Sequence, residues 1–151
     1  MKKIGILYHP KVKATLLKAK ELETFIASRG LTVWLCSAWE RDQACDLMNG
    51  TDLVLTVGGD GTILRAAQAV MGRTPIAGIN LGRLGFMAEL DADQALEMIP
   101  VLLEKKGWID ERSMLEAEVS GTGGKHHVYH ALNDVVVARG AIARVIRIDI
   151  D

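Results

Sequence analysis

Residues 53–62, Leu-Val-Leu-Thr-Val-Gly-Gly-Asp-Gly-Thr, join an apolar run to three glycines and one acid. The apolar run is typical of a buried strand, and the alanine-rich stretch from Thr62 to Met71 predicts a helix directly after it. Glycines let backbone N–H groups come close to an anion, and a helix N-terminus adds a favourable partial positive charge. The segment therefore predicts a site for a phosphate chain.

Asp60 is the unexpected residue in this segment, because a carboxylate repels phosphate. Two chemical roles would explain it: the carboxylate accepts a proton from an attacking hydroxyl group, or it holds Mg²⁺. The plainer alternative is a tight strand-to-helix turn with an acid near the helix start. Neither the dinucleotide pattern GxGxxG nor the phosphate-loop pattern GxxxxGK[ST] is matched.

Two further segments have the composition of ligand-binding loops. Residues 80–87, Asn-Leu-Gly-Arg-Leu-Gly-Phe-Met, follow a predicted strand and place an arginine between two glycines. This composition predicts a loop shaped around a ligand, or else a glycine-rich connection whose apolar side chains pack below it. Residues 131–137, Ala-Leu-Asn-Asp-Val-Val-Val, set Asn133 and Asp134 before a β-branched run. That pair is typical of a turn and equally of a binding position.

The elements that must position these residues alternate between strand and helix. Apolar runs predict strands at residues 4–8, 31–35, 52–57 and 75–79. Helices are predicted from Val12 to a C′ residue at Gly30, from Thr62 to Met71, and after Asp91, with Gln94 as its capping partner and Pro100 as a kink or restart. Strands alternating with helices imply a parallel sheet with helices on its faces. Residues 1–107 are therefore predicted to form an α/β nucleotide-binding domain.

The pattern changes near Gly107. Apolar and acidic residues alternate from Leu115 to Val119, which predicts a half-buried strand, and residues 126–138 are predicted to be further extended chain. Residues 146–151 alternate again, and the chain stops inside this strand pattern. Residues 108–151 are therefore predicted to be the opening strands of an incomplete β-rich substrate domain.

Composition excludes several classes of protein. The 151 residues are 49% hydrophobic and 25% charged, which excludes intrinsic disorder. A net charge of -1 gives no electrostatic reason to expect nucleic-acid binding. No apolar run reaches the ~20 residues of a membrane span, and none forms a signal-peptide core. Cys36 and Cys45 lack the spacing of a metal or redox site, which predicts reduced thiols in a cytoplasmic protein.

Other residues carry weaker signals. The three histidines of residues 126–130 fall on opposite faces of a predicted strand, so they do not predict a metal site. Lys11 and Lys13 lie beyond the carboxyl end of a strand, where phosphates often bind, although a solvated helix face explains them equally. The tryptophans are predicted to be core or interface anchors: Trp34, Trp39 and Trp108.

The three glycine- and asparagine-containing segments together resemble the NAD kinase family. Residues 58–62 are similar to its GGDGT signature, which diacylglycerol kinases, sphingosine kinases and 6-phosphofructokinases share more loosely. Residues 80–87 resemble its NxGxLGF stretch, with Met87 where leucine is usual, and residues 131–136 resemble its ALN[ED]VV element. The segments occur in the family's order, and the resemblance covers essentially the whole chain as given.

This resemblance implies an enzyme that transfers phosphate from ATP, or from polyphosphate, to the adenosine ribose 2′-hydroxyl of NAD, giving NADP. Asp60 matches the family's proton acceptor, and Gly61 matches the neighbouring backbone contact. Asn133 and Asp134 match substrate-binding positions. The resemblance also implies Mg²⁺ that arrives with the nucleotide, so no separate metal site is expected on the protein.

Arg65 and Arg144 fall at positions where family members also touch the dinucleotide, and a surface charge explains each equally well. The family's threonine-, glycine- and serine-rich substrate segment is absent from this sequence, which implies a fragment with reduced or no activity. The full-length protein is expected to be a homo-oligomer with no nucleic-acid or membrane partner. Two alternatives stay open: a lipid kinase of the GGDG type, which would need an acyl pocket, and a non-catalytic dinucleotide-binding module.

Overall fold

The computed structural model describes residues 1–82, 85–121, 124 and 126–138. The chain divides into two compact units, Met1–Arg112 and Ser113–Asp151. The first unit contains β1 (Lys3–Tyr8), α1 (Lys13–Ala27), β2 (Thr32–Ser37), α2 (Arg41–Leu47), β3 (Leu53–Val57), α3 (Asp60–Val70), β4 (Ile76–Asn80), β5 (Leu90–Asp91) and α4 (Ala95–Leu103). The second unit contains β6 (Leu115–Ser120) and β7 (His126–Ala131).

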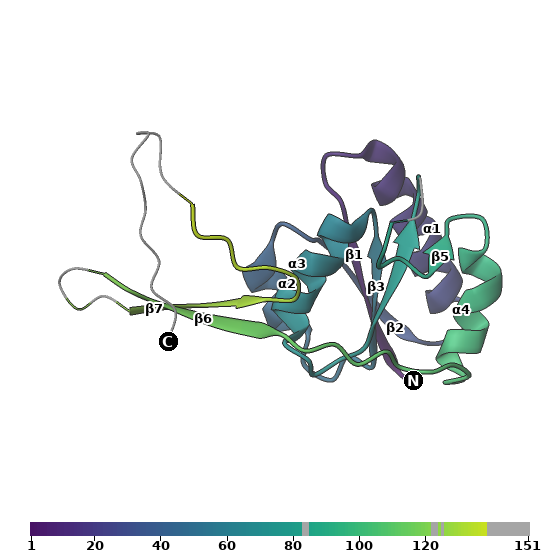
Figure 1. The fold of residues 1–151 in the computed structure, drawn as a ribbon. Coiled ribbons are helices and arrows are strands. Elements are labelled where there is room, and N and C mark those ends of the chain that lie inside the picture. The colour runs from purple at the N-terminus through teal and green to yellow at the C-terminus, as the bar shows by residue number, and fades with distance from the viewer. Residues whose placement is uncertain (83–84, 122–123, 125, 139–151) are drawn as a thin grey trace. The chain divides into compact units, whose positions relative to one another are not determined.

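The first unit is a parallel sheet between two layers of helices (Figure 1). Its strand order is β2-β1-β3-β4-β5, and every neighbouring pair is parallel. Helices α1 and α4 pack on one face of the sheet, and α2 and α3 pack on the other. The predicted α/β fold with a parallel sheet is confirmed.

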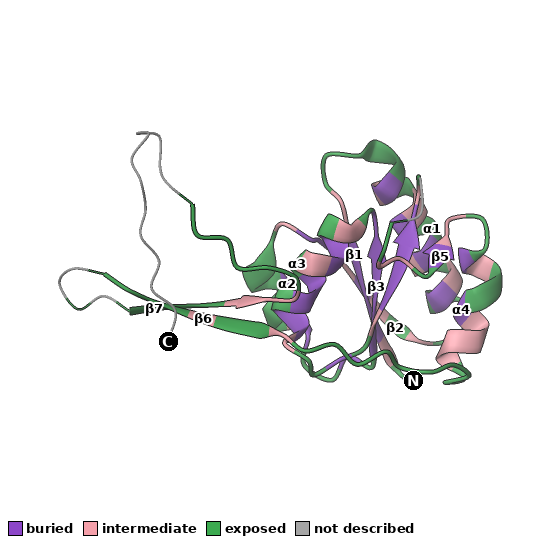
Figure 2. Cartoon of the chain, viewed as in Figure 1, coloured by how far each residue is buried: buried purple, intermediate pink, exposed green. Residues whose placement is uncertain are grey.

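The core is divided between the two faces because side chains alternate along each strand. In β1, Ile4 and Ile6 join the cluster under α1 and α4, whereas Leu7 joins the cluster under α2 and α3. In β3, Leu55 and Val54 divide in the same way. These strands are purple over most of their length in Figure 2, as strands covered on both faces must be.

Three details of the predicted elements are wrong or incomplete. Helix α4 begins at Ala95, because the Asp91 carboxylate accepts the N–H groups of Asp93 and Gln94 at 3.0 and 2.8 Å and holds a turn before it. The helix then runs through Pro100 to Leu103 without restarting. Helix α2 and the two-residue strand β5 were not predicted.

The second unit contains an antiparallel hairpin. Strands β6 and β7 pair from Leu115 opposite Ala131 to Ser120 opposite His126. The prediction of a half-buried strand is wrong for the described residues, since Leu115 and Val119 are 50% and 51% exposed. Extended pairing ends at Ala131, and residues 134–138 form neither helix nor strand. The predicted strand at 146–151 lies outside the described residues.

Both cysteines are free thiols, one buried and one exposed. Burial, followed by the charge of and hydrogen bond to Glu40, raises the pKa of the Cys36 thiol to about 11. Cys36 is therefore protonated at neutral pH, which makes it a poor nucleophile. Among the described helices, none is long and apolar enough to cross a bilayer.

Substitution of Gly5 tests the packing of β1. A Cβ on Gly5 would lie 2.6 Å from Cε2 of Trp34, and Trp34 cannot swing away freely because its Nε1–H donates to Thr51 Oγ1 at 2.9 Å. We expect Gly5→Ala to destabilise the protein by about 1–3 kcal/mol through overpacking, measured by urea unfolding. Gly107→Ala is the control, since a Cβ there meets no atom within 4 Å. Equal stability of the two variants would contradict this packing.

Candidate functional site

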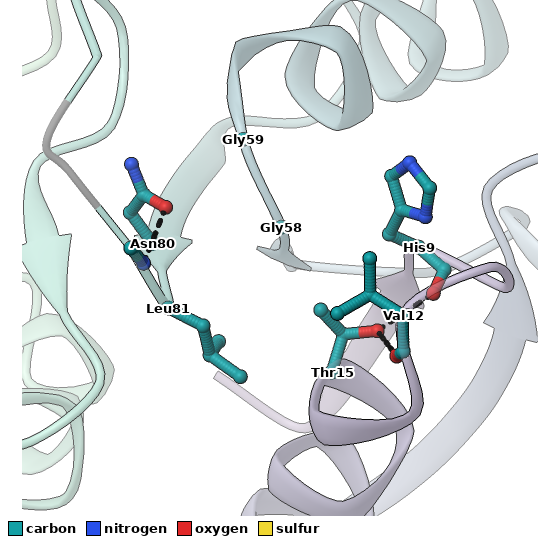
Figure 3. Close-up of a pocket in the computed structure, with 8 residues that line it drawn as sticks. His9, Val12, Thr15, Gly58, Gly59, Asn80 and Leu81 are labelled. Carbon is teal, nitrogen blue, oxygen red and sulfur yellow. Dashed lines mark hydrogen bonds between the residues drawn. The ribbon is translucent and has the colours of Figure 1, made fainter.

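A pocket of about 230 Å³ lies at the carboxyl edge of the parallel sheet. Its walls come from the segments that follow β1, β3 and β4, and Figure 3 shows these segments facing one another across the pocket. The chain winds outward in both directions from β1 and β3, and ligands of open α/β sheets bind outside the carboxyl ends of strands at such a switch point. The lining residues are His9, Val12, Thr15, Gly58, Gly59, Asn80, Leu81 and Gly82.

The pocket walls are fixed by hydrogen bonds that continue the sheet beyond its strands. The N–H of His9 donates to Val57 O at 3.1 Å, and the N–H of Gly58 donates to Ile79 O at 2.9 Å. On the α1 side, the Thr15 hydroxyl donates to the carbonyl oxygen of His9 at 2.6 Å. These bonds tie the backbone around the pocket to the sheet and to α1.

The glycines of residues 58–61 differ in whether packing within the protein requires a glycine at that position. A Cβ on Gly58 would overlap Oγ1 of Thr62, so packing alone requires a glycine there. A Cβ on Gly59 or Gly61 would meet no atom within 4 Å, and neither residue has a positive φ. Since glycine inside a helix costs roughly 0.5–1 kcal/mol relative to alanine, the internal structure does not explain Gly61. The space over Gly59 and Gly61 is open to an approaching ligand.

The start of α3 supplies hydrogen-bond donors beside this space. The first N–H groups of a helix have no intrahelical acceptor. The N–H of Thr62 bonds to Gly59 O at 2.8 Å, whereas those of Asp60 and Gly61 have no acceptor in the described part of the chain. Two free N–H groups at the N-terminus of an eleven-residue helix form a site suited to a phosphate oxygen.

The half-buried carboxylate of Asp60 joins two of the segments singled out in the sequence. Its Oδ2 accepts the N–H of Phe86 at 3.0 Å, and its Oδ1 accepts the N–H of Met87 at 3.3 Å. It makes no side-chain cap on its own helix. A carboxylate has about four acceptor positions, so Asp60 holds the 85–87 backbone and keeps capacity for a ligand hydroxyl group.

Gly85 is required by this contact. A Cβ on Gly85 would overlap the Asp60 carboxylate, with the carboxyl carbon 2.6 Å away. Asn80, at the other end of the same loop, is buried, and its Oδ1 accepts the N–H of Gly82 at 3.0 Å. The exposed Phe86 (99%) does not pack below the loop, so a purely packing role for this apolar residue is wrong.

Arg65 is exposed on α3, but it is not an isolated surface charge. Its guanidinium carbon lies 4.0 Å from the centroid of the Trp39 ring, a cation–π contact. The same tryptophan ring lies 4.4 Å from the ring of His9, at the pocket. His9 and Trp39 could not be assigned to a site from the sequence, because nothing in the spacing of residues 9, 39 and 65 links them.

The remaining predicted residues belong to the second unit. Asn133 and Asp134 follow β7 and are both exposed. Arg144 lies outside the described residues. Within the hairpin, His126 and His130 pair with Glu118 and Glu116 at 3.1 and 3.0 Å. The described residues contain no group of three histidine, cysteine or acidic side chains placed to hold a metal ion.

Substitution of Gly85 tests the contact between Asp60 and the loop. We expect Gly85→Ala to push the carboxylate out of place and to cost about 1–3 kcal/mol of stability, measured by thermal and urea unfolding. Gly82→Ala is the matched control in the same loop, since its nearest neighbour to a Cβ is Asn80 Oδ1 at 3.9 Å. If both variants are as stable as wild type, the Asp60 carboxylate does not pack against Gly85 as described.

The known proteins that are similar to this chain belong to the family that its three motifs resemble. Residues 8–107 match the ATP-NAD kinase N-terminal domain. An NAD kinase of Dehalococcoides mccartyi is 45% identical over 99% of the chain and 54% of its own length. An NAD kinase of Chloroflexus aurantiacus is 32% identical over 99% of the chain and 55% of its own length. The chain thus spans about half the length of the curated relatives it matches.

Solved structures share the fold at lower identity. Yeast NADH kinase complexed with NADH has a TM-score of 0.75 at 23% identity, covering 88% of this chain and 44% of its own. An NAD kinase from Archaeoglobus fulgidus in complex with ATP has a TM-score of 0.51 at 24% identity. The match covers 77% of this chain and 40% of the other. With the domain match over residues 8–107 and the three motifs in order, the chain belongs to the NAD kinase family.

Proposed function

We propose that this chain supplies the nucleotide-binding part of an NAD kinase, which transfers phosphate from ATP, or from polyphosphate, to the adenosine ribose 2′-hydroxyl of NAD. The observation that carries the proposal is the Asp60 carboxylate, fixed by two backbone N–H groups at 3.0 and 3.3 Å. It lies at the start of α3, next to the open backbone of Gly59 and Gly61. A proton acceptor and an anion site are thereby adjacent.

In the proposed mechanism, the N–H groups of Asp60 and Gly61 hold oxygens of the transferred phosphate. A free acceptor position of the Asp60 carboxylate takes the proton of the ribose hydroxyl as attack begins. Because the carboxylate is already fixed by Phe86 and Met87, little reorganisation is needed in the transition state. The NAD kinase relatives and the family match support this proposal.

Mg²⁺ would neutralise charge on the phosphates when bound. We propose that the ion is held mainly by the oxygens of the nucleotide's phosphates. The free backbone N–H groups of α3 would then share the same phosphate chain.

Asn133 and Asp134 would position the ribose and adenine, and Arg65 and Arg144 would contact the dinucleotide. We also propose that residues 1–107 are the nucleotide-binding domain and 108–151 the opening strands of a substrate domain. On this proposal the 151-residue chain alone has reduced or no activity, and the full-length protein is a cytoplasmic homo-oligomer. The match to the N-terminal domain of the family, over residues 8–107, supports the first boundary.

Of the alternatives, the lipid kinase is less well supported, because the relatives of Dehalococcoides mccartyi and Chloroflexus aurantiacus described above are NAD kinases. A non-catalytic dinucleotide-binding module would bind NAD without forming NADP. Measuring NADP formation by the complete protein therefore distinguishes this alternative from the proposed kinase.

Substitution of Asp60 tests the proton-acceptor role. In the complete protein, we expect Asp60→Asn to lower turnover by about 10²–10⁴-fold with little change in NAD affinity, measured by a coupled NADP assay and by titration. An asparagine also turns an NH₂ group toward the N–H of Phe86 or Met87, so the variant disturbs the loop as well.

Gly85→Ala helps to separate these two effects, because it disturbs the contact between the carboxylate and the loop but leaves a proton-accepting group at residue 60. A base role predicts that Asp60→Asn loses far more turnover than Gly85→Ala. Equal losses would assign Asp60 to positioning alone. Partial rescue of Asp60→Asn at high Mg²⁺ would assign it to the metal, and near-normal turnover of the folded variant would refute the mechanism.

Substitution of Gly61 tests whether a ligand approaches its backbone. Since Gly61 lies inside α3 with open space at its Cβ position, we expect Gly61→Ala to raise stability by up to about 1 kcal/mol. It should nevertheless weaken nucleotide binding, because the new methyl group would occupy the ligand's space. Unchanged affinity with raised stability would mean that no ligand comes close to this residue.

A further inference from the structure

Trp39 connects two cationic or protonatable side chains from distant parts of the chain. Its ring lies 4.4 Å from the His9 ring at an interplanar angle of 58°, and 4.0 Å from the Arg65 guanidinium carbon. His9 follows β1, Trp39 follows β2, and Arg65 lies on α3. The Trp39 side chain is half-buried against the core cluster under α2 and α3, which holds the ring. The backbone N–H of Trp39 donates to Ser37 Oγ at 3.2 Å, which ties the residue to the end of β2.

His9 is held in one orientation at the pocket. Its Nδ1 accepts the N–H of Lys11 at 3.2 Å. An acceptor nitrogen carries a lone pair, so this bond selects the tautomer with its proton on Nε2. The described residues give Nε2 no acceptor. In Figure 3 the imidazole stands at the rim of the pocket, across the Gly58–Gly59 turn from Asn80.

The charges around this rim favour an anion. Among the described residues, no acidic side chain lines the pocket. The neighbouring Asp60 is acidic, but its carboxylate oxygens accept the N–H groups of Phe86 and Met87. The free N–H groups at the start of α3 lie one residue beyond Gly59, and Arg65 is a little over one turn further along the same helix. Imidazole, guanidinium and backbone N–H groups are all donors, and together they match the several acceptor oxygens of linked phosphates.

We propose that Trp39 is a positioning residue that holds His9 and Arg65 as donors to a diphosphate group bound at this pocket, with His9 Nε2–H bonding a phosphate oxygen directly. The inference rests on the proposed kinase function, which supplies a phosphate-bearing ligand. The diphosphate belongs either to the phosphoryl donor or to the dinucleotide acceptor, since both contain linked phosphates.

The first test separates the two nitrogens of His9. The His9→Asn amide can still accept the Lys11 N–H near the position of Nδ1, but it lacks a donor at Nε2. The longer side chain of His9→Gln places an NH₂ group near Nε2 and loses the Nδ1 acceptor. With sodium tripolyphosphate as the probe and isothermal titration of the 151-residue chain, we expect His9→Asn to bind about tenfold more weakly. His9→Gln should stay within about threefold of wild type.

The second test addresses Trp39. We expect Trp39→Leu to weaken tripolyphosphate binding about tenfold and Trp39→Phe to restore most of it, because phenylalanine keeps an aromatic face for His9 and Arg65. The double variant Trp39→Leu with His9→Asn should lose little more than Trp39→Leu alone, since loss of the Trp39 ring already removes the support of His9. Trp108→Leu is the control, as Trp108 is 91% exposed.

Competition identifies the source of the diphosphate. Displacement of tripolyphosphate by ATP but not by NAD assigns the site to the donor, and the reverse assigns it to the acceptor. Because every pocket residue lies in Met1–Arg112, the wild-type chain must bind the probe. Absence of binding, or equal binding by wild type and His9→Asn, overturns the proposal. Neither outcome alters the NADP assay of the Asp60 variants, so the two proposals fail separately.

Discussion

The site depends on one interaction, the bonding of the Asp60 carboxylate to the N–H groups of Phe86 and Met87. It fixes the start of α3 and the loop after β4 against each other, and Gly85 leaves the space for it. A carboxylate in this position has two tasks, because the oxygens that hold the loop belong to the group proposed to take a proton. A substitution of Asp60 therefore affects both the proposed proton transfer and the position of the loop that follows β4.

The parallel sheet makes this coupling possible. Hydrogen bonds from His9 to Val57 and from Gly58 to Ile79 extend the ladder past the last residues of the strands, so the turns begin from a fixed edge. The glycines divide into two groups on this edge. Gly58 and Gly85 leave room for neighbouring side chains of the protein, whereas the space over Gly59 and Gly61 is empty. The second group is where a ligand has access to the backbone.

Much of this could be predicted from the sequence. The buried strands were visible as apolar runs, and parallel strands must bring the segments after β3 and β4 to one edge. Helix α2 could not be predicted from the apolar pattern, because the helix is short and buries only Ala44. The contact of Asp60 with residues 86 and 87 could not be predicted, since it depends on the path of the loop. The sequence indicated Trp39 only as a core or interface anchor, because His9 and Arg65 are brought to its ring only by the folded sheet.

Strand β5 has a thermodynamic consequence. Although it has only two residues, Leu90 pairs with Ile79 and Asp91 with Asn80, and the N–H of Glu89 donates to Gly78 O at 3.2 Å. Both ends of the segment between Asn80 and Leu90 are therefore tied to the same strand. The conformational entropy lost on closing that segment is compensated by sheet pairing, far from the ligand. Because β5 already fixes the chain directly after residues 86 and 87, the Asp60 carboxylate has to hold only the backbone of those two residues.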